Sequence, residues 1–213
     1  MSATTIFVSP KGGNCTTVTA SAHALLSAQR GSRTLLIDLC GDVPAVVGMV
    51  EPDTPGINDW LGESTVSDAE SMVRLGTPYT DGLVVLHRGA RFVEGAPRWS
   101  ALAEAVASIP HDVYIDAGTG FVPDGFLDAV GNVVMVTRPC YLSLKKATRM
   151  RKPRSVCVIR EDGRALSVDD VGNVIGAPVS AVVPYEPAIS RAVDAGLLAS
   201  RVEQLLGRHI PIG

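Results

Sequence analysis

Aromatic and charged side chains are scarce in this sequence. They make up 5% and 19% of its 213 residues, whereas hydrophobic residues make up 46%. The apolar residues are mostly Ala, Val and Leu, which is typical of a parallel sheet covered by helices. The formal net charge is only −3. This value excludes a uniformly basic nucleic-acid-binding protein but leaves room for a local basic patch.

The sequence also lacks the patterns of metal-binding, membrane and secreted proteins. No CxxC pair and no His at ligand spacing accompany the cysteines, which argues against a structural zinc site and favours free thiols in a reducing cytoplasm. No apolar run reaches about 18 residues, so we expect no transmembrane helix. Residues 1–5 have neither a charged segment nor a long apolar segment, so we expect no signal peptide and a cytoplasmic protein. The cysteines are Cys15, Cys40, Cys140 and Cys157.

Short β-rich runs alternate with helical stretches along the whole chain. This alternation, with continuous apolar strands, predicts an α/β fold: a doubly wound, mostly parallel sheet with helices on both faces. Because no long linker interrupts the pattern, we expect a single domain over residues 1–213. The expected strands are residues 5–8, 34–38, 83–87, 112–116, 132–137, 155–159 and 179–183, and the expected helices are residues 16–29, 68–75, 99–108, 142–150 and 188–206.

Ligands of such sheets bind beyond the carboxyl ends of the strands. Three informative segments are predicted there: residues 9–14, 38–42 and 116–120. The first lies between a strand and a helix, where a P-loop reads GxxxxGK[ST] and holds phosphate with backbone N–H groups and the helix N-terminus. Residues 10–17 read PKGGNCTT. Alone this is a poor match, and an ordinary strand-to-helix turn is the alternative.

Four segments together strengthen the match. Residues 11–13 read KGG and residues 30–38 read RGSRTLLID, while residues 111–116 read HDVYID and residues 182–189 read VVPYEPAI. They resemble the deviant phosphate loop KGGxGKTT, the RGxRxLLIDxD segment, the Walker B strand and the late IPxDxxV segment of the ParA/MinD family of positioning ATPases. The resemblance covers most of the chain and implies a P-loop NTPase-like fold.

This resemblance implies a site for ATP or ADP with Mg²⁺. Lys11 corresponds to the signature lysine of the family, and Lys11 and Asp38 would serve catalysis. Thr17, Asp38 and Asp116 would hold the metal ion through the nucleotide. The alternative for both aspartates is that they only cap loops at strand ends. The residues in contact with the nucleotide would be Lys11, Gly12, Gly13, Asn14, Cys15, Thr16, Thr17 and, near the adenine, Pro184.

Four residues depart from the family pattern. Pro10 stands at the first loop Gly, Cys15 at the last loop Gly, Thr16 at the P-loop Lys and Cys40 at the second acid of the DxD pair. Loss of the Lys removes a charge-assisted contact of about 1.5–3 kcal/mol. Pro10 has no N–H, and Cys15 adds a Cβ where the backbone approaches phosphate. We therefore expect weak or absent ATP binding and little hydrolysis. Cys40 itself fits a buried small side chain better than a redox thiol.

The resemblance implies a homodimer linked by nucleotide, in which Lys11 reaches the phosphates of the second copy. Such a dimer would act with a protein partner in chromosome or plasmid partition, division-site selection or polar placement. The alternative is a nucleotide-independent pseudo-ATPase that keeps the fold as a scaffold for protein partners. A metabolic ligase of the same fold would need an intact phosphate loop and further substrate residues, which we do not find.

One dense basic run occurs late in the chain. A basic patch is sufficient for non-specific DNA binding, which ParA-type proteins show, while a solvated helix end is the alternative. Residues 197–206 lack the basic face of a membrane-binding helix, so we expect them to pack onto the domain. The basic residues are Lys145, Lys146, Arg149, Arg151, Lys152 and Arg154.

Overall fold

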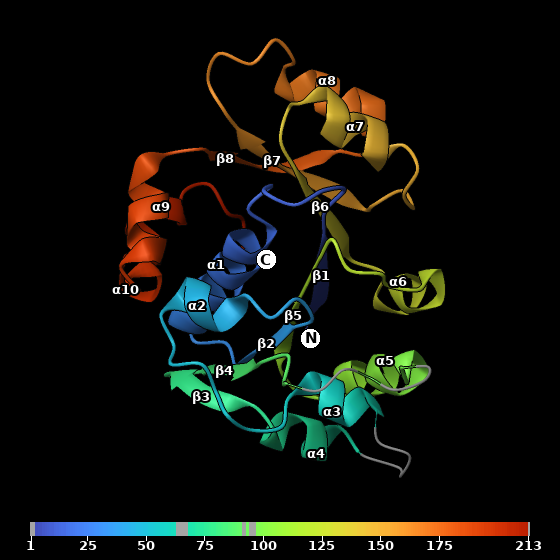
Figure 1. Cartoon of the computed structure of the whole chain (residues 1–213), viewed down its shortest axis with the longest axis vertical. Coiled ribbons are helices and arrows are strands. Elements are labelled where there is room, and N and C mark those ends of the chain that lie inside the picture. Colours follow the sequence, from blue (N-terminus) through green and yellow to red (C-terminus); the bar gives the residue numbers. More distant parts are fainter. Residues whose placement is uncertain (1–2, 63–67, 91–92, 94–96, 213) are drawn as a thin grey trace.

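Eight strands form one sheet in the order β3-β4-β2-β5-β1-β6-β7-β8 (Figure 1). The computed structural model describes residues 3–62, 68–90, 93 and 97–212. Neighbouring strands are parallel except for the antiparallel pair β3 and β4 at one edge. The strands are β1 (Thr4–Val8), β2 (Thr34–Asp38), β3 (Thr77–Thr80), β4 (Leu83–Leu86), β5 (Asp112–Gly118), β6 (Val133–Thr137), β7 (Ser155–Arg160) and β8 (Val179–Pro184).

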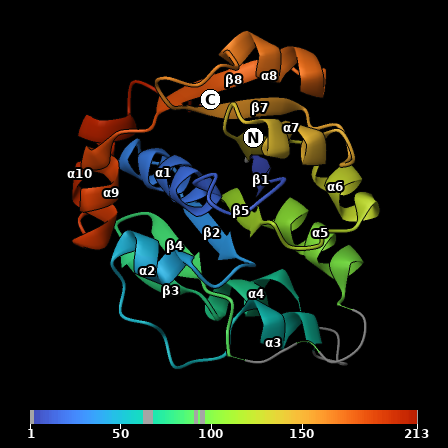
Figure 2. The same ribbon diagram turned by 45° about the horizontal axis from the view of Figure 1, so that its top comes forward.

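Helices cover both faces of the sheet (Figure 2). One layer consists of α1 (Thr16–Gln29), α2 (Val43–Val47), α9 (Pro187–Asp194) and α10 (Leu198–Leu206). The other layer consists of α3 (Ile57–Gly62), α4 (Ala69–Arg74), α5 (Trp99–Ser108), α6 (Asp124–Val130), α7 (Tyr141–Ala147) and α8 (Val168–Ile175). In the part of the chain that the structure describes, no helix combines the length and the apolar character needed to cross a membrane.

Alternating side chains of the central strands supply two separate cores. Phe7 and Leu36 face the layer that contains α1, whereas Ile6, Leu35 and Ile37 face the opposite layer. All five side chains are fully buried. Since the side-chain period of a strand is two residues, a one-residue register slip would exchange side chains between the two cores and disrupt the packing of both. This packing fixes where β1 and β2 end, and their ends position the loops of the candidate site.

The strand order reverses at β1. From β1 the chain crosses through α1 to β2 on one side, and β6 lies on the other side of β1. In open α/β sheets, a ligand crevice forms beyond the carboxyl ends of the strands at such a reversal. The loop after β1 therefore begins at the position where this fold class binds its ligands.

The predicted doubly wound, mostly parallel sheet with helices on both faces is confirmed. The bounds of α1, β2 and α5 agree with the prediction residue by residue. The predicted helix at residues 142–150 is too long, because α7 ends at Ala147. Sequence reasoning missed β3 and four short helices, namely α2, α3, α6 and α8.

The predicted single helix at residues 188–206 is wrong, because the segment forms α9 and α10. The helices separate at Gly196, which has the left-handed φ of +66° that ends many helices. A Cβ added to Gly48 would lie 2.6 Å from the Gly196 carbonyl oxygen, so the break lets α9 and α2 approach closely. Leu198 and Val202 of α10 are fully buried against the core, which confirms the expected packing of the C-terminal segment.

Candidate functional site

The loop that follows β1 is tied to its neighbours by Ser9. The Ser9 N–H donates to the carbonyl of Gly118 at 2.6 Å, and the Ser9 hydroxyl donates to the carbonyl of Val136 at 3.0 Å. The buried Asn14 amide closes the loop by donating to the hydroxyls of Ser9 and Ser143, both at 2.9 Å. The loop is thereby held to β5, β6 and α7 at once.

Cys15 adopts a backbone conformation that favours glycine. Its φ of 61° and ψ of 32° are left-handed, and it is the one non-glycine residue with positive φ among those described. This conformation costs about 1–2 kcal/mol for a residue with a Cβ. The loop therefore keeps the path that a glycine would give it, although position 15 is a cysteine.

The backbone N–H groups of the loop are unpaired. In the described structure, none of residues 11–17 donates a backbone hydrogen bond to another group of the chain. The row runs into the N-terminus of α1, where N–H groups lack partners and the helix dipole is positive. Successive N–H groups in this arrangement form an anion-binding cradle. An ordinary turn would leave the exposed Gly12 and Gly13 N–H groups to water as well, so the anion-binding role of the loop stays a prediction.

A cavity of about 610 Å³ lies in front of these N–H groups. Its size is that of pockets for small molecules and cofactors. Three cations line it: Lys11 from the loop, Arg88 from the end of β4 and Arg138 from the end of β6. The ammonium of Lys11 donates to the Gly12 carbonyl at 2.9 Å near the surface. The predicted loop residues Gly12, Gly13, Asn14, Cys15, Thr16 and Thr17 all line this cavity.

Asp38 organises the loop after β2. Its buried carboxylate accepts the backbone N–H groups of Cys40 at 2.9 Å, Gly41 at 2.7 Å and Val43 at 3.0 Å. Burial raises the pKa of Asp38, and these three hydrogen bonds oppose the rise. The loop-capping interpretation is thus supported by geometry, while the catalytic and metal-binding roles of Asp38 stay predictions.

Asp116 lies beside Asp38, but its carboxylate accepts fewer hydrogen bonds. It is fully buried, and one carboxylate oxygen accepts the Gly118 N–H at 3.1 Å. The other oxygen, Oδ2, has no hydrogen-bond partner among the described residues. Burial raises the pKa of Asp116 to about 7, while the Thr17 hydroxyl lowers it and the Asp38 charge raises it further. An unpaired carboxylate oxygen near a hydroxyl suits Mg²⁺, which prefers oxygen ligands.

Cys40 lies between the two carboxylates. Ligand atoms of Cys40, Asp38 and Asp116 are all within 4.8 Å of one another. Its side chain is only partly buried, so the prediction of a buried small side chain holds in part. Burial, followed by the nearby carboxylate charges, raises the pKa of the Cys40 thiol to about 12. It therefore stays a neutral thiol, a soft ligand that Mg²⁺ does not favour.

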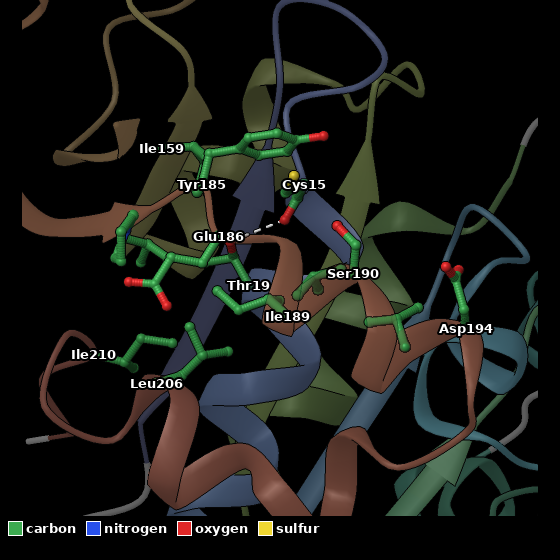
Figure 3. A pocket seen from close by; sticks show the side chains of 14 residues that line it. Cys15, Thr19, Ile159, Tyr185, Glu186, Ile189, Ser190, Asp194, Leu206 and Ile210 are labelled. Carbon is green, nitrogen blue, oxygen red and sulfur yellow. Dashed lines mark hydrogen bonds between the residues drawn. The ribbon is translucent and has the colours of Figure 1, made fainter. Parts of the chain in front are cut away.

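Pro184 lies outside the loop cavity. It lines a second, apolar cavity of about 170 Å³ between α1, β8 and α9 (Figure 3). Cys15 and Tyr185 line both cavities, and the Tyr185 ring extends over Cys15 (Figure 3). The two spaces are therefore adjacent. Sequence reasoning missed Arg88, Arg138 and Tyr185, although Arg88 and Arg138 directly follow predicted strands and Tyr185 is the second residue after one.

The basic run lies away from this site. It extends from the end of α7 to the start of β7, which is the amino-terminal edge of the sheet, whereas the loop cavity lies at the carboxyl edge. All six cations are exposed. Arg151 forms an ion pair with Asp128, and the other five have no ion pair in the described structure. The run is Lys145, Lys146, Arg149, Arg151, Lys152 and Arg154.

Fold and site together define a doubly wound α/β protein whose loop after β1 lines a cavity at the strand-order reversal. The sequence matches no family model and no curated protein. Solved structures nevertheless match over nearly the whole chain, and they show that the fold is that of ParA/MinD ATPases.

The ParA family ATPase from Chlorobium tepidum has a TM-score of 0.78 and 22% identity over 97% of this chain and 93% of its own. MinD from Aquifex aeolicus has a TM-score of 0.70 and 22% identity over 100% of both chains. MinD from Pyrococcus horikoshii, complexed with Mg-ADP, has a TM-score of 0.70 and 16% identity over 96% of this chain and 90% of its own.

Because in the described structure Asp38 accepts three backbone hydrogen bonds and Asp116 only one, replacing each by Asn should change the free energy of unfolding differently. Asp38→Asn should lower the free energy of unfolding by about 2–3 kcal/mol, because an amide cannot accept all three N–H groups. Asp116→Asn should not lower the free energy of unfolding at pH 8, and it should make that free energy depend less on pH. Since burial raises the pKa of Asp116, its contribution to stability is full below pH about 4 and is lost as the pH rises through about 7.

Urea denaturation at pH 5 and pH 8, with EDTA and without nucleotide, measures both effects. If Asp116→Asn lowered the free energy of unfolding as much as Asp38→Asn, the Asp116 carboxylate would be a structural hydrogen-bond acceptor. That result would contradict the expected difference between the two aspartates.

Proposed function

We propose that this chain is a ParA/MinD-like positioning or partitioning protein of the cytoplasm. It binds ATP or ADP with Mg²⁺ and acts as a nucleotide-linked homodimer with weak or absent hydrolysis. The observation that carries the proposal is the row of unpaired N–H groups at residues 11–17, which faces a cavity of about 610 Å³ at the strand-order reversal. The similar Pyrococcus horikoshii MinD is complexed with Mg-ADP, and the similar Cyanothece McdA with ATP.

The chemistry of the site suits a magnesium nucleotide. Phosphate oxygens would accept the loop N–H groups, and the Thr17 hydroxyl with the unpaired Asp116 oxygen would hold the ion. Bound Mg²⁺ would neutralise phosphate charge. The apolar cavity beside Pro184 and Tyr185 offers a surface for the flat face of the base. Cys15 lies where the two cavities meet, so one ligand could contact both.

Weak hydrolysis follows from the residues around the phosphate position. Thr16 supplies no charge to stabilise the transition state, which electrostatics dominate in phosphoryl transfer. The high pKa of the Cys40 thiol prevents it from acting as a carboxylate would. Both oxygens of Asp38 already accept backbone N–H groups. The chain therefore retains more of the binding geometry than of the hydrolytic machinery.

ATP turnover by the purified protein should be near background, even with DNA or lipid added. Cys15→Gly with Thr16→Lys should raise ATP affinity about tenfold or more, because a lysine restores a charge-assisted contact. The matched control is Cys15→Gly with Thr16→Gln, which adds a long side chain at position 16 without a positive charge. Turnover equal to that of a ParA or MinD ATPase assayed in parallel would contradict the loss of hydrolysis.

Dimerisation across the loop is supported by the exposed carboxyl edge of the sheet. Gly12 and Gly13 are exposed, and two large apolar side chains stand near the same edge: Phe121, 84% exposed after β5, and Tyr141, 74% exposed at the start of α7. A second copy would cover these side chains. Lys11 lies at this surface and could reach an anion held by the second copy. An ammonium that becomes desolvated needs an anionic partner.

Nucleotide should therefore strengthen the dimer. We expect ATP with Mg²⁺ to lower the dimer dissociation constant, and Lys11→Ala to remove this effect while leaving the monomer folded. Lys146→Ala, at the opposite edge of the sheet, is the matched control. Sedimentation with and without nucleotide measures the equilibrium. A dimer of equal strength in both conditions, unaffected by Lys11→Ala, would contradict the nucleotide-linked model.

That contrary result would favour the second candidate function, a nucleotide-independent scaffold for protein partners. The exposed Phe121 and Tyr141 side chains supply an apolar surface for such a partner. A structure similar to this chain, with 19% identity and a TM-score of 0.70, is the MinC:MinD cell division protein complex of Aquifex aeolicus.

Non-specific DNA binding is proposed for the basic run. Six exposed cations within ten residues, five of them without an ion pair in the described region, form a patch that can follow a phosphate backbone. Binding of this kind releases counterions, so affinity falls steeply with salt and ignores sequence.

Reversal of charge at Lys145, Lys146, Arg149 and Arg151 to Glu should abolish a mobility shift with long duplex DNA at low salt. The control is the same reversal at four exposed arginines outside the run, Arg74, Arg191, Arg201 and Arg208. The DNA proposal fails if the wild-type protein gives no shift, or if both sets of reversals weaken binding equally.

A further inference from the structure

Thr16 stands where the P-loop pattern has a lysine, but other cations line the loop cavity. We propose that Arg138 takes over the binding of a di- or triphosphate group from the missing loop lysine. This inference rests on the proposed nucleotide binding and names the residue that makes it feasible. Arg138 is the cavity cation whose guanidinium contacts the loop itself, with Nη2 3.5 Å from the Cys15 sulfur.

Three contacts hold the Arg138 guanidinium in place. It stacks on the Tyr185 ring at 4.2 Å, its Nη1 is 3.6 Å from a carboxylate oxygen of Glu161, and its Nη2 approaches Cys15. These partners come from the ends of β7 and β8 and from the phosphate loop. The side chain is 18% exposed, so most of its conformational freedom is already lost before a ligand binds. A pre-positioned cation of this kind loses little entropy on binding.

The guanidinium is also incompletely satisfied. Its buried Nε has no hydrogen-bond partner among the described residues, and a thiol sulfur is a weak acceptor for Nη2. Arginine offers several donors in a planar fork that matches phosphate oxygens. A phosphate group on the loop N–H groups would therefore be a better acceptor than the Cys15 thiol.

Arginines outnumber carboxylates in the ion pairs around Glu161. Glu161 is shared, since Arg164 also donates to it through Nη2 at 2.7 Å and Nε at 3.0 Å. Two arginines thus face one carboxylate. Arg164 does not line the cavity, whereas Arg138 does. Arg138 therefore presents an incompletely neutralised positive charge to the cavity, which Asp42 also lines.

The other two cavity cations are less suited to replace the lysine. Lys11 binds the Gly12 carbonyl near the surface, where the proposed second copy would meet it. Arg88 donates through Nη1 to the Cys40 carbonyl at 3.1 Å, on the β2 side of the cavity. Arg138 is directed to Cys15, the residue next to Thr16.

Isothermal titration of the full chain with Mg-ATP and, separately, with pyrophosphate tests the assignment. Arg138→Ala should weaken binding of both probes about ten- to a hundred-fold, and Arg138→Lys should weaken it less. Adding Thr16→Lys to Arg138→Ala should restore most of the lost affinity, because the charge returns to the same ligand from the loop. Arg164→Ala, which removes the other partner of Glu161, should change affinity less than about threefold.

Salt provides a second readout that a merely structural role would not change. The affinity of the wild-type protein should fall more steeply with ionic strength than that of Arg138→Gln, since the variant has one cation fewer. Thermal unfolding of each variant checks folding, and Arg138→Gln and Arg138→Lys serve if Arg138→Ala is unstable.

The outcomes separate this inference from the proposed function. If the wild-type protein binds neither probe, nucleotide binding fails and this inference fails with it. If the wild-type protein binds both and Arg138→Ala binds within about threefold, only the inference is overturned. If Arg138→Ala loses Mg-ATP but keeps pyrophosphate, the arginine acts on the base or ribose, and the phosphate assignment is wrong.

Discussion

The unpaired N–H groups of residues 11–17 are the constraint on which the rest of the site depends. Their direction is fixed by Ser9, which bonds to β5 and β6, and by the left-handed backbone of Cys15. Because these donors have no acceptor within the described part of the chain, they are available to an anion that enters the cavity. We interpret the cavity by its position relative to this row. The same holds for the flanking cations and the buried acids.

Around that row, charge is supplied from several elements rather than from the loop. Lys11, Arg88 and Arg138 come from three different strand ends, and the carboxylates of Asp38 and Asp116 lie close to each other at the ends of β2 and β5. A site of this kind can keep affinity for phosphate while losing the groups that speed its transfer, because binding and transition-state stabilisation need different contacts. The proposed function accordingly combines nucleotide binding with little hydrolysis.

Much of the fold could be predicted because local patterns and packing agree. The segment from β1 through α1 to β2 combines continuous apolar strands with a glycine-rich turn, and its bounds matched closely. The break at Gly196 was missed although a glycine near a helix end is a local signal, whereas the close approach of Gly196 to Gly48 joins segments distant in sequence. Arg138 was missed for the same reason: its contacts with Tyr185, Glu161 and Cys15 join four separate segments. Cys15 gave no sign in the sequence that it would retain the backbone of a glycine.

Chemical-shift mapping of backbone amides during a titration with Mg-ATP tests the central claim most directly. The account predicts that the largest shifts fall on the N–H groups of residues 11–17, because phosphate oxygens would become their hydrogen-bond acceptors. Shifts confined to other surfaces, with the amides of residues 11–17 unchanged at saturating nucleotide, would contradict it. The same result would follow if the loop were only a turn between β1 and α1.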